Sequence, residues 1–204
     1  MPNYIGIVGY NEDNGGSMFA GKDTVAGIIE DGLKKIGASS HVLPFAEHLK
    51  TTAAYMFQLS EFHFYDQEWK SKIIPEYNMT PREILQVFGT DCVRKHFGDD
   101  FWINATFSKA DKMKEDFVII PDIRFQNEID AVKAKGGKIL GVRRKNSQSN
   151  GQFTGHSSEN TCLQLIEQAE IEFINDSTLE NLKEEVYNKF LNVSFSIIHA
   201  HLGA

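Results

Sequence analysis

Five short apolar runs, each bounded by polar or glycine residues, are spaced along the chain. They occupy residues 5–8, 41–43, 117–120, 139–142 and 171–174. Continuous runs of this length are typical of strands that are buried on both faces of a parallel sheet. The pattern therefore predicts about five parallel strands.

Helical periodicity fills most of the intervals between these runs. From Thr24 to Ile36 apolar residues return every three or four positions, and Gly37 is placed to end that helix. Residues 80–83, Thr-Pro-Arg-Glu, combine an N-cap, a proline at the first helical position and a glutamate three residues after the cap, so a helix begins there. Alternating strands and helices predict a three-layer α/β fold with a parallel sheet flanked by helices.

Two regions interrupt this alternation. Residues 45–114 have helical patterns but no convincing strand, which predicts a helical insertion that covers a substrate. Residues 145–155 are polar and contain glycine, as expected of a loop, and we interpret residues 143–159 as a lid. No repeat or linker is evident, so we expect residues 1–204 to form a single domain.

The charge balance limits the choice of partners. A formal net charge of −7 argues against a nucleic acid polymer as partner, because binding a duplex needs a surplus of clustered lysine and arginine. No stretch approaches the roughly 20 apolar residues that span a bilayer, and no basic, apolar leader precedes the first strand. We expect a cytoplasmic protein, without membrane contact, that handles small molecules.

Residues 16–22, Gly-Ser-Met-Phe-Ala-Gly-Lys, fit the G-x-x-x-x-G-K part of the phosphate-binding P-loop. In such a loop backbone N–H groups turn toward phosphate oxygens, the following helix adds its dipole, and the lysine reaches the β and γ phosphates. Asp23 stands where serine or threonine usually holds Mg²⁺, and residues 10–15 separate the expected strand end at Gly9 from the loop. A glycine-rich surface turn is the alternative. The strand, loop and helix context favours a phosphate site made of Gly16, Ser17, Ala20, Gly21 and Lys22.

Asp122 ends the apolar run 117–121 and is expected at the carboxyl edge of a buried strand. Ligands gather at this edge of open α/β sheets. A carboxylate there can orient Mg²⁺ directly or through water. An N-cap for the following helix is the alternative role, and the two roles do not exclude each other.

All the arginines lie between positions 82 and 144, whereas lysines are spread along the whole chain. Guanidinium groups bind phosphate bidentately, so this confinement suggests recognition of phosphate beyond the loop. Arg124 and Arg143 each follow the end of an apolar run, and we expect both to face one crevice. Surface salt bridges are the alternative for each member of the set, which comprises Arg82, Arg94, Arg124, Arg143 and Arg144.

The sequence lacks the order of serine, histidine and aspartate that supports nucleophilic catalysis, and it has no histidine-rich metal motif. We interpret His156, in a polar loop, as a structural residue. A phosphate monoester acceptor needs no general base, because its second pKa of about 6 leaves it mostly dianionic at pH 7. It needs charge screening and alignment, which a P-loop, Mg²⁺ and arginines supply.

Several separate motifs together resemble the deoxynucleoside monophosphate kinases of tailed bacteriophages, and the resemblance runs through most of the chain. It implies the nucleoside monophosphate kinase fold and transfer of the γ-phosphate of Mg·ATP to a deoxynucleoside monophosphate, giving the diphosphate and ADP. Residues 10–15 depart from the family pattern. The motifs are residues 21–24 (Gly-Lys-Asp-Thr), 80–91 (Thr-Pro-Arg-Glu-Ile-Leu-Gln-Val-Phe-Gly-Thr-Asp), 100–103 (Asp-Phe-Trp-Ile), 122–128 (Asp-Ile-Arg-Phe-Gln-Asn-Glu) and 156–159 (His-Ser-Ser-Glu).

Carried over by position, the resemblance assigns roles to individual residues. Lys22, Asp23 and Thr24 become the ATP and Mg²⁺ residues, with Asp122 as a second Mg²⁺ partner, directly or through water. The expected catalytic set is Lys22, Arg82, Arg124 and Arg143. The acceptor site would comprise Lys50, Arg82, Gly89, Thr90, Asp91, Trp102, Arg124 and Glu128. For Trp102, stacking on a base and a place in the core both stay open.

Two rival functions remain beside the nucleotide kinase. A kinase for another small metabolite, as in phosphomevalonate and dephospho-coenzyme A kinases, shares the loop and the layout. A regulatory module would bind ATP without transferring phosphate. The apolar tail of residues 190–204 is expected to pack on the core or on a second subunit, in a homodimer. The sequence leaves the accepted base and sugar open.

Overall fold

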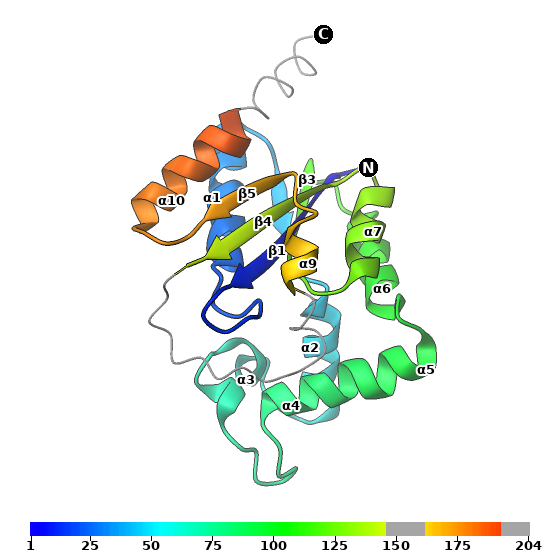
Figure 1. Cartoon of the computed structure of the whole chain (residues 1–204). Helices are drawn as coiled ribbons and strands as arrows, with labels where there is room; N and C mark the ends of the chain where they lie inside the picture. Colours follow the sequence, from blue (N-terminus) through cyan, green and yellow to red (C-terminus); the bar gives the residue numbers. More distant parts are fainter. Residues whose placement is uncertain (146–161, 193–204) are drawn as a thin grey trace. The chain divides into compact units, whose positions relative to one another are not determined.

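A computed structural model of the chain describes residues 1–145 and 162–192 (Figure 1). The chain divides into two compact units. Unit 1 joins residues 1–44 to the described residues from 110 onward, and unit 2 comprises residues 45–109.

A five-stranded sheet forms the centre of unit 1. Its strands are in the order β2-β3-β1-β4-β5, and every neighbouring pair is parallel. Each strand contains or overlaps one of the apolar runs, so the prediction of about five parallel strands is confirmed. The strands are β1 (Asn3–Asn11), β2 (Ser40–Val42), β3 (Phe117–Ile123), β4 (Lys138–Arg144) and β5 (Ile171–Ile174).

Helices cover both faces of this sheet, as Figure 1 shows. On one face α1, α10 and the short π-helical turn η3 enclose a core of fully buried side chains that includes Ile7, Leu33 and Phe173. On the other face α7 and α9 contact β1 and β4. The predicted three-layer α/β architecture is therefore confirmed. The helices are α1 (Lys22–Lys35), α7 (Gln126–Ala134), α9 (Cys162–Ile166), α10 (Leu179–Val186) and η3 (Tyr187–Leu191).

The end of α1 follows the predicted pattern. Gly37 has a φ of 79°, which is a left-handed conformation that glycine adopts without steric cost. The N–H of Ala38 then reaches back to the carbonyl of Leu33 at 3.1 Å and closes the last turn. The glycine therefore ends the helix, as expected.

Unit 2 is helical, and residues 45–109 contain no β-strand. Its small core gathers Ala53, Ala54, Phe64 and Ile84. Residues 81–97 form one helical stretch whose middle part, η2, is π-helical (Figure 1). The elements are α2 (Ala46–Met56), α3 (Phe62–Tyr65), η1 (Trp69–Ser71), α4 (Pro81–Gln86), η2 (Val87–Arg94), α5 (Lys95–Phe97) and α6 (Phe101–Ala110).

The predicted capping box at the start of α4 is present. The hydroxyl of Thr80 accepts from the N–H of Glu83 at 3.2 Å, and the carboxylate of Glu83 accepts from the N–H of Thr80 at 2.8 Å. Pro81 occupies the first helical position, where its missing N–H costs nothing. The sequence signal therefore fixed the start of this helix correctly.

Trp102 belongs to the interior of unit 2. Its side chain is 8% exposed, its ring packs edge-on against Phe88 and Phe101, and its indole N–H donates to the carbonyl of Gly89 at 3.1 Å. A buried indole N–H needs such a partner. Of the two roles left open by the sequence, this packing favours the core.

A three-residue network ties the start of β1 to the end of α7 in unit 1. The carboxylate of Asp111 accepts from Lys135 Nζ at 2.7 Å and from the hydroxyl of Tyr4 at 2.8 Å. The bond from Lys135, followed by that from Tyr4, lowers the pKa of Asp111. Burial, followed by the bond to Asp111, raises the pKa of Tyr4.

The topology predicts that a ligand binds at one edge of the sheet. β1 continues into α1 on one face, whereas its neighbour β3 continues into α7 on the other face. Adjacent parallel strands whose helices leave to opposite faces open a crevice outside their carboxyl ends. The loop after β1 and the last residues of β3 therefore flank this crevice. Separately, no helix in the described part of the chain is long and apolar enough to cross a bilayer.

We expect Trp102→Phe to lower the free energy of unfolding by about 1–2 kcal/mol, because the hydrogen bond to Gly89 is lost and the smaller phenyl ring fills less of the buried space. The matched control is Trp69→Phe, in which the indole is 36% exposed and little change is expected. Denaturant titration measures both. An increase in the KM for an acceptor nucleotide with no loss of stability would instead favour base stacking.

We expect Asp111→Asn to lower the free energy of unfolding at pH 7 by up to about 1 kcal/mol, a value discounted because both charged side chains are about one third exposed. A carboxyl group whose pKa is lowered in the folded state stabilises the protein above its unfolded pKa of about 4, and this contribution is lost as the pH falls through the folded pKa. The difference between wild type and variant should therefore shrink between pH 5 and pH 2. A constant difference across this range would contradict the assignment.

Candidate functional site

The predicted phosphate loop lies between β1 and α1, at the carboxyl edge of the sheet. The expectation that β1 ends at Gly9 was wrong, because the strand continues to Asn11, which pairs with Arg144 of β4. Polar residues at these positions hid the extension. Residues 11–16 then close into a turn, in which the N–H of Asn11 donates to the carbonyl of Gly16 at 2.7 Å and the N–H of Gly15 donates back to Asn11 at 2.9 Å.

Lys22 is the first residue of α1 and is 9% exposed. Its Nζ donates to the carbonyl of Ser17 at 2.7 Å, so the ammonium group lies across the loop. Gly9 lies directly beneath its alkyl chain, since a Cβ at Gly9 would stand 2.6 Å from Lys22 Cγ. Sequence reasoning treated Gly9 only as a strand end. The missed signal was a glycine at the end of a buried strand that precedes the loop.

Three consecutive backbone N–H groups of the loop are available as donors. Within residues 1–145 and 162–192, the N–H groups of Phe19, Ala20 and Gly21 donate to no acceptor. Phe19 and Gly21 have φ angles of 57° and 102°. Left-handed residues in such a turn direct successive N–H groups to one side and create a concave anion site. The loop therefore has the backbone geometry that binding a phosphate needs.

The N-terminus of α1 adds to the positive potential of the loop. The helix has 14 residues, and its N-cap Gly21 has no side-chain hydrogen bond to the first turn. The positive end of the helix dipole and the unpaired N–H groups of a first turn favour an anion. Asp23 and Thr24 lie exposed in this turn. Lys22 and the helix end thus contribute positive charge at the same place.

Asp122 lies within β3, half-buried and one residue before the strand ends. Asp122 does not occupy the N-cap position of α7, which is Phe125. The carboxylate of Glu128, in the first turn of α7, accepts from the N–H groups of Arg124 at 2.7 Å and Phe125 at 3.1 Å. Glu128 is 5% exposed. The structure thus gives Glu128 a capping function, and its expected contact with an acceptor stays a prediction.

The two oxygen donors expected to hold Mg²⁺ are Thr24 and Asp122. No group of three or more histidine, cysteine, aspartate or glutamate side chains in the described part of the chain is arranged to hold a metal. Mg²⁺ usually binds through one or two protein oxygens together with water and substrate phosphates. A hydroxyl and a carboxylate next to a phosphate loop fit this chemistry.

Arg143, at the end of β4, is held by an ion pair. Its Nε and Nη2 donate to the two carboxylate oxygens of Glu172 at 2.7 and 3.1 Å, and Glu12 lies 3.7 Å away. The pairing with Glu172 raises the pKa of Arg143 above its ordinary value. Contact with a phosphate through Nε and Nη2 would require this bidentate pair to open, and the catalytic role of Arg143 stays a prediction.

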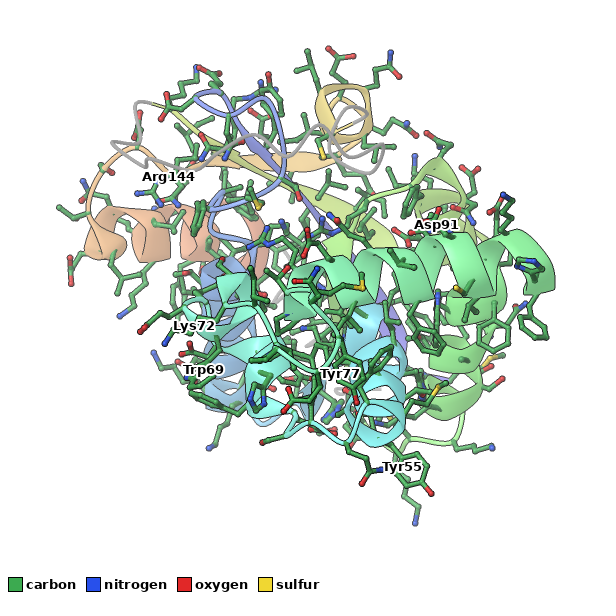
Figure 2. The ribbon with its side chains drawn as sticks, turned by 90° about the horizontal axis from the view of Figure 1, so that it is seen from below. Tyr55, Trp69, Lys72, Tyr77, Asp91 and Arg144 are labelled. Atoms are coloured by element: carbon green, nitrogen blue, oxygen red, sulfur yellow. The ribbon has the colours of Figure 1, made fainter. Side chains whose placement is uncertain are left out.

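The expected acceptor residues of unit 2 occupy different environments. Arg82 is half-buried in the first turn of α4, and Asp91 is exposed on η2 (Figure 2). A Cβ at Gly89 would stand 2.6 Å from Leu49 Cδ2, so the glycine allows α2 and η2 to pack closely. Lys50 lies 4.1 Å from the centre of the Tyr65 ring. Thr90 is half-buried on η2.

Trp69 is an aromatic residue that sequence reasoning missed. Unlike Trp102, it exposes 36% of its surface, and Lys72 Nζ lies 4.4 Å from the centre of its ring (Figure 2). The local sequence does distinguish the two tryptophans, because Trp69 stands between Glu68 and Lys70, whereas Trp102 is flanked by Phe101 and Ile103. Charged neighbours are the signal that could have marked Trp69 as the exposed ring.

The expected site residues fall into both units. Unit 1 holds the loop, Asp122, Arg124, Arg143 and Glu128, whereas unit 2 holds Lys50, Arg82, Gly89, Thr90, Asp91 and Trp102. A single crevice that unites them stays a prediction. Most of the expected lid, residues 146–159 with His156, lies outside the described residues, as does most of the apolar tail after residue 192.

The chain is similar in sequence to two viral proteins. The chain is 29% identical over 193 residues to a protein of Acanthamoeba polyphaga mimivirus provisionally named deoxynucleotide monophosphate kinase, a match that covers 88% of this chain and 95% of the relative. It is also 29% identical over 110 residues to the deoxynucleotide monophosphate kinase of Enterobacteria phage T4, covering 52% of this chain and 44% of that one. The solved structure of shikimate kinase from Aquifex aeolicus is 11% identical, with a TM-score of 0.47 over 98% of this chain and 99% of its own.

The family model described as deoxynucleotide monophosphate kinase matches residues 38–186. This range contains the motifs at residues 80–91 and 122–128, and it begins after α1, so the phosphate loop lies outside it. The match therefore does not depend on the loop. The chain belongs to the deoxynucleotide monophosphate kinase family and is a kinase.

Proposed function

We propose that this protein transfers the γ-phosphate of Mg·ATP to a deoxynucleoside monophosphate and releases the diphosphate and ADP. The observation that carries the proposal is the loop in unit 1, where three consecutive N–H groups and Lys22 surround one anion site in a chain of this kinase family. The family supplies the class of acceptor, and the loop supplies the means of binding a donor phosphate.

The donor half of the site acts through charge and position. The N–H groups of Phe19, Ala20 and Gly21 bind phosphate oxygens, and Lys22 exchanges the carbonyl of Ser17 for the β and γ phosphates. Gly16 and Ser17 form the entry to the loop. Because these groups are oriented before ATP binds, little reorganisation remains for the transfer step.

Mg²⁺, held by Thr24 and by Asp122 directly or through water, would neutralise charge on the donor phosphates. Asp23, exposed beside Thr24, would join this part of the site. The residues of the protein fix the position of the phosphates, and the acceptor phosphate attacks as a dianion without a general base.

The acceptor half of the site is drawn from both units. We propose that Arg82 and Arg124 screen the acceptor phosphate, with Lys50 nearby, and that Arg143 contributes after its pair with Glu172 opens. The backbone and side chains of Gly89, Thr90 and Asp91 would position the nucleoside. We also propose that residues 143–159 close over the site as a lid that excludes water. We also propose that the protein is a homodimer, that it lies in the cytoplasm and that its substrates are small molecules.

Two rival functions give different results in one assay. A kinase for another small metabolite would release ADP only with that metabolite, and family membership disfavours it. A regulatory module would bind ATP without acceptor-dependent release of ADP. The assay follows ADP release from Mg·ATP with dGMP, dTMP, dCMP, dAMP and GMP in turn.

We expect Lys22→Ala to reduce kcat by at least about 100-fold, since it removes a preoriented positive group from the transferring phosphate. The control is Lys35→Ala at the other end of α1, where Nζ donates to the hydroxyl of Tyr187 at 2.8 Å. Circular dichroism verifies that both variants are folded. Full turnover by Lys22→Ala would refute the proposed donor site.

We expect Arg82→Ala to raise the KM for the acceptor nucleotide about tenfold and to leave the KM for ATP unchanged, because the proposed role of its guanidinium is to bind the acceptor phosphate and not ATP. Lys95→Ala, an exposed lysine farther along the same helical stretch, serves as the control. Steady-state kinetics with each substrate varied in turn measure the effect. An equal rise in both KM values would remove Arg82 from the acceptor site.

A further inference from the structure

Three consecutive carbonyl groups of the phosphate loop are each held by side chains from other parts of unit 1. The carbonyl of Met18 accepts from Asn11 Nδ2 at 3.2 Å and from Asn14 Nδ2 at 3.1 Å. The carbonyl of Phe19 accepts from Arg144 Nη1 at 3.2 Å, and that of Ala20 accepts from Asn175 Nδ2 at 2.9 Å. Figure 2 labels Arg144, which comes from the end of β4.

These bonds determine where the N–H groups of the loop point. In a trans peptide the C=O of one residue and the N–H of the next point in opposite directions, and the described chain has no cis peptide. Holding the carbonyls of Met18, Phe19 and Ala20 therefore fixes the directions of the N–H groups of Phe19, Ala20 and Gly21, each opposite to the carbonyl before it. These are the three N–H groups assigned to the phosphate.

The side-chain amides of Asn11 and Asn14 are held in the orientation that lets them donate to the carbonyl of Met18. Asn11 is 0% exposed, and its Oδ1 accepts from the N–H of Asp13 at 3.1 Å. Asn14 is 8% exposed, and its Oδ1 accepts from the N–H of Gly16 at 2.9 Å. Because each amide oxygen accepts from the backbone, each amide NH₂ is left to face Met18.

The conformation of Phe19 shows that the loop needs such restraint. A φ of 57° is unfavourable for a bulky residue and persists only where the surroundings enforce it. The peptide before Phe19 is held by the two asparagines, and the peptide after it is held by Arg144. The strained residue thus lies between two fixed peptides.

We propose that Asn11 and Asn14 are positioning residues for the phosphate site, and that the turn of residues 11–16 preorganises the loop for the β and γ phosphates of ATP. The inference rests on the proposed function for the identity of the ligand. Neither asparagine contacts the phosphate; both act through the Met18 peptide. Ordering the loop before binding removes an entropic cost that ATP binding would otherwise bear.

The test compares Asn14→Ala and Asn11→Ala with Asn3→Ala. Asn3 lies at the opposite end of β1 and donates the same kind of bond, from Nδ2 to the carbonyl of Asp116 at 3.0 Å. All three substitutions are neutral, so none changes the charge near the site.

The probes are inorganic tripolyphosphate with Mg²⁺, which occupies the phosphate site alone, and AMP, which lacks the β and γ phosphates. Titration calorimetry gives the Kd values.

We expect Asn14→Ala and Asn11→Ala each to raise the Kd for tripolyphosphate and the KM for ATP about tenfold. The Kd for AMP and the KM for the acceptor should stay within about twofold, and Asn3→Ala should match wild type. The double variant should lose less than the product of the single losses, because both bonds end on one carbonyl. An unchanged Kd for tripolyphosphate, or equal losses for every ligand, would overturn the inference.

Two further measurements keep the result decisive. If Asn14→Ala does not fold, Asn14→Ser replaces it. The serine keeps an oxygen acceptor for the N–H of Gly16 but cannot reach Met18. We expect the same tenfold rise in the Kd for tripolyphosphate. If wild type binds tripolyphosphate but phosphorylates no deoxynucleotide, the proposed function fails while the ratio of Kd values still decides the role of the asparagines. Failure of wild type to bind tripolyphosphate would overturn the inference as well.

Discussion

The central position of β1 is the constraint on which unit 1 depends. β1 pairs in parallel with β3 on one side and β4 on the other, so the carboxyl ends of three strands meet at one edge of the sheet. The phosphate loop follows β1, Asp122 lies at the end of β3, and Arg143 lies at the end of β4. Backbone pairing in the interior therefore brings together chemical groups that are more than a hundred residues apart in sequence. The buried apolar side chains that stabilise this pairing contribute to the site only by fixing the register of its strands.

The elements that sequence reasoning predicted are those with local signals. Continuous apolar runs marked the five strands, and the Thr80, Pro81 and Glu83 pattern marked the start of α4, because each of these choices is made by neighbouring residues. The end of β1 was missed because Tyr10 and Asn11 lie beyond the apolar run, and their pairing with Arg143 and Arg144 of β4 is a contact across the sheet. The role of Asn175, which holds the carbonyl of Ala20, depends on a contact across 155 positions. The exposure of Trp69 and the burial of Trp102 agree with their polar and apolar neighbours, a local signal that sequence reasoning did not use.

Contacts within unit 1 occupy two of the arginines that were expected to bind phosphate. Arg143 is already matched to Glu172 with bidentate geometry, and Arg144 donates to a carbonyl of the loop rather than to an anion. Two of the arginines between positions 82 and 144 thus make contacts within the fold, and their grouping in the sequence does not by itself indicate phosphate binding. Removing a guanidinium from a paired carboxylate has a desolvation and pairing cost, so Arg143 can serve catalysis only where substrate charge compensates for the lost partner.

The closed turn of residues 11–16 also explains how a strand and a phosphate loop can stay close in space when several residues lie between them. The turn begins and ends at the same place, because Asn11 and Gly16 form a bridge, so the added residues leave almost no net displacement between the strand and the loop. Gly9 lies under Lys22, although residues 10–21 separate the two in sequence. A closed turn of this kind therefore adds to the residue count on which a motif of fixed spacing depends, while it leaves the strand and the lysine in contact.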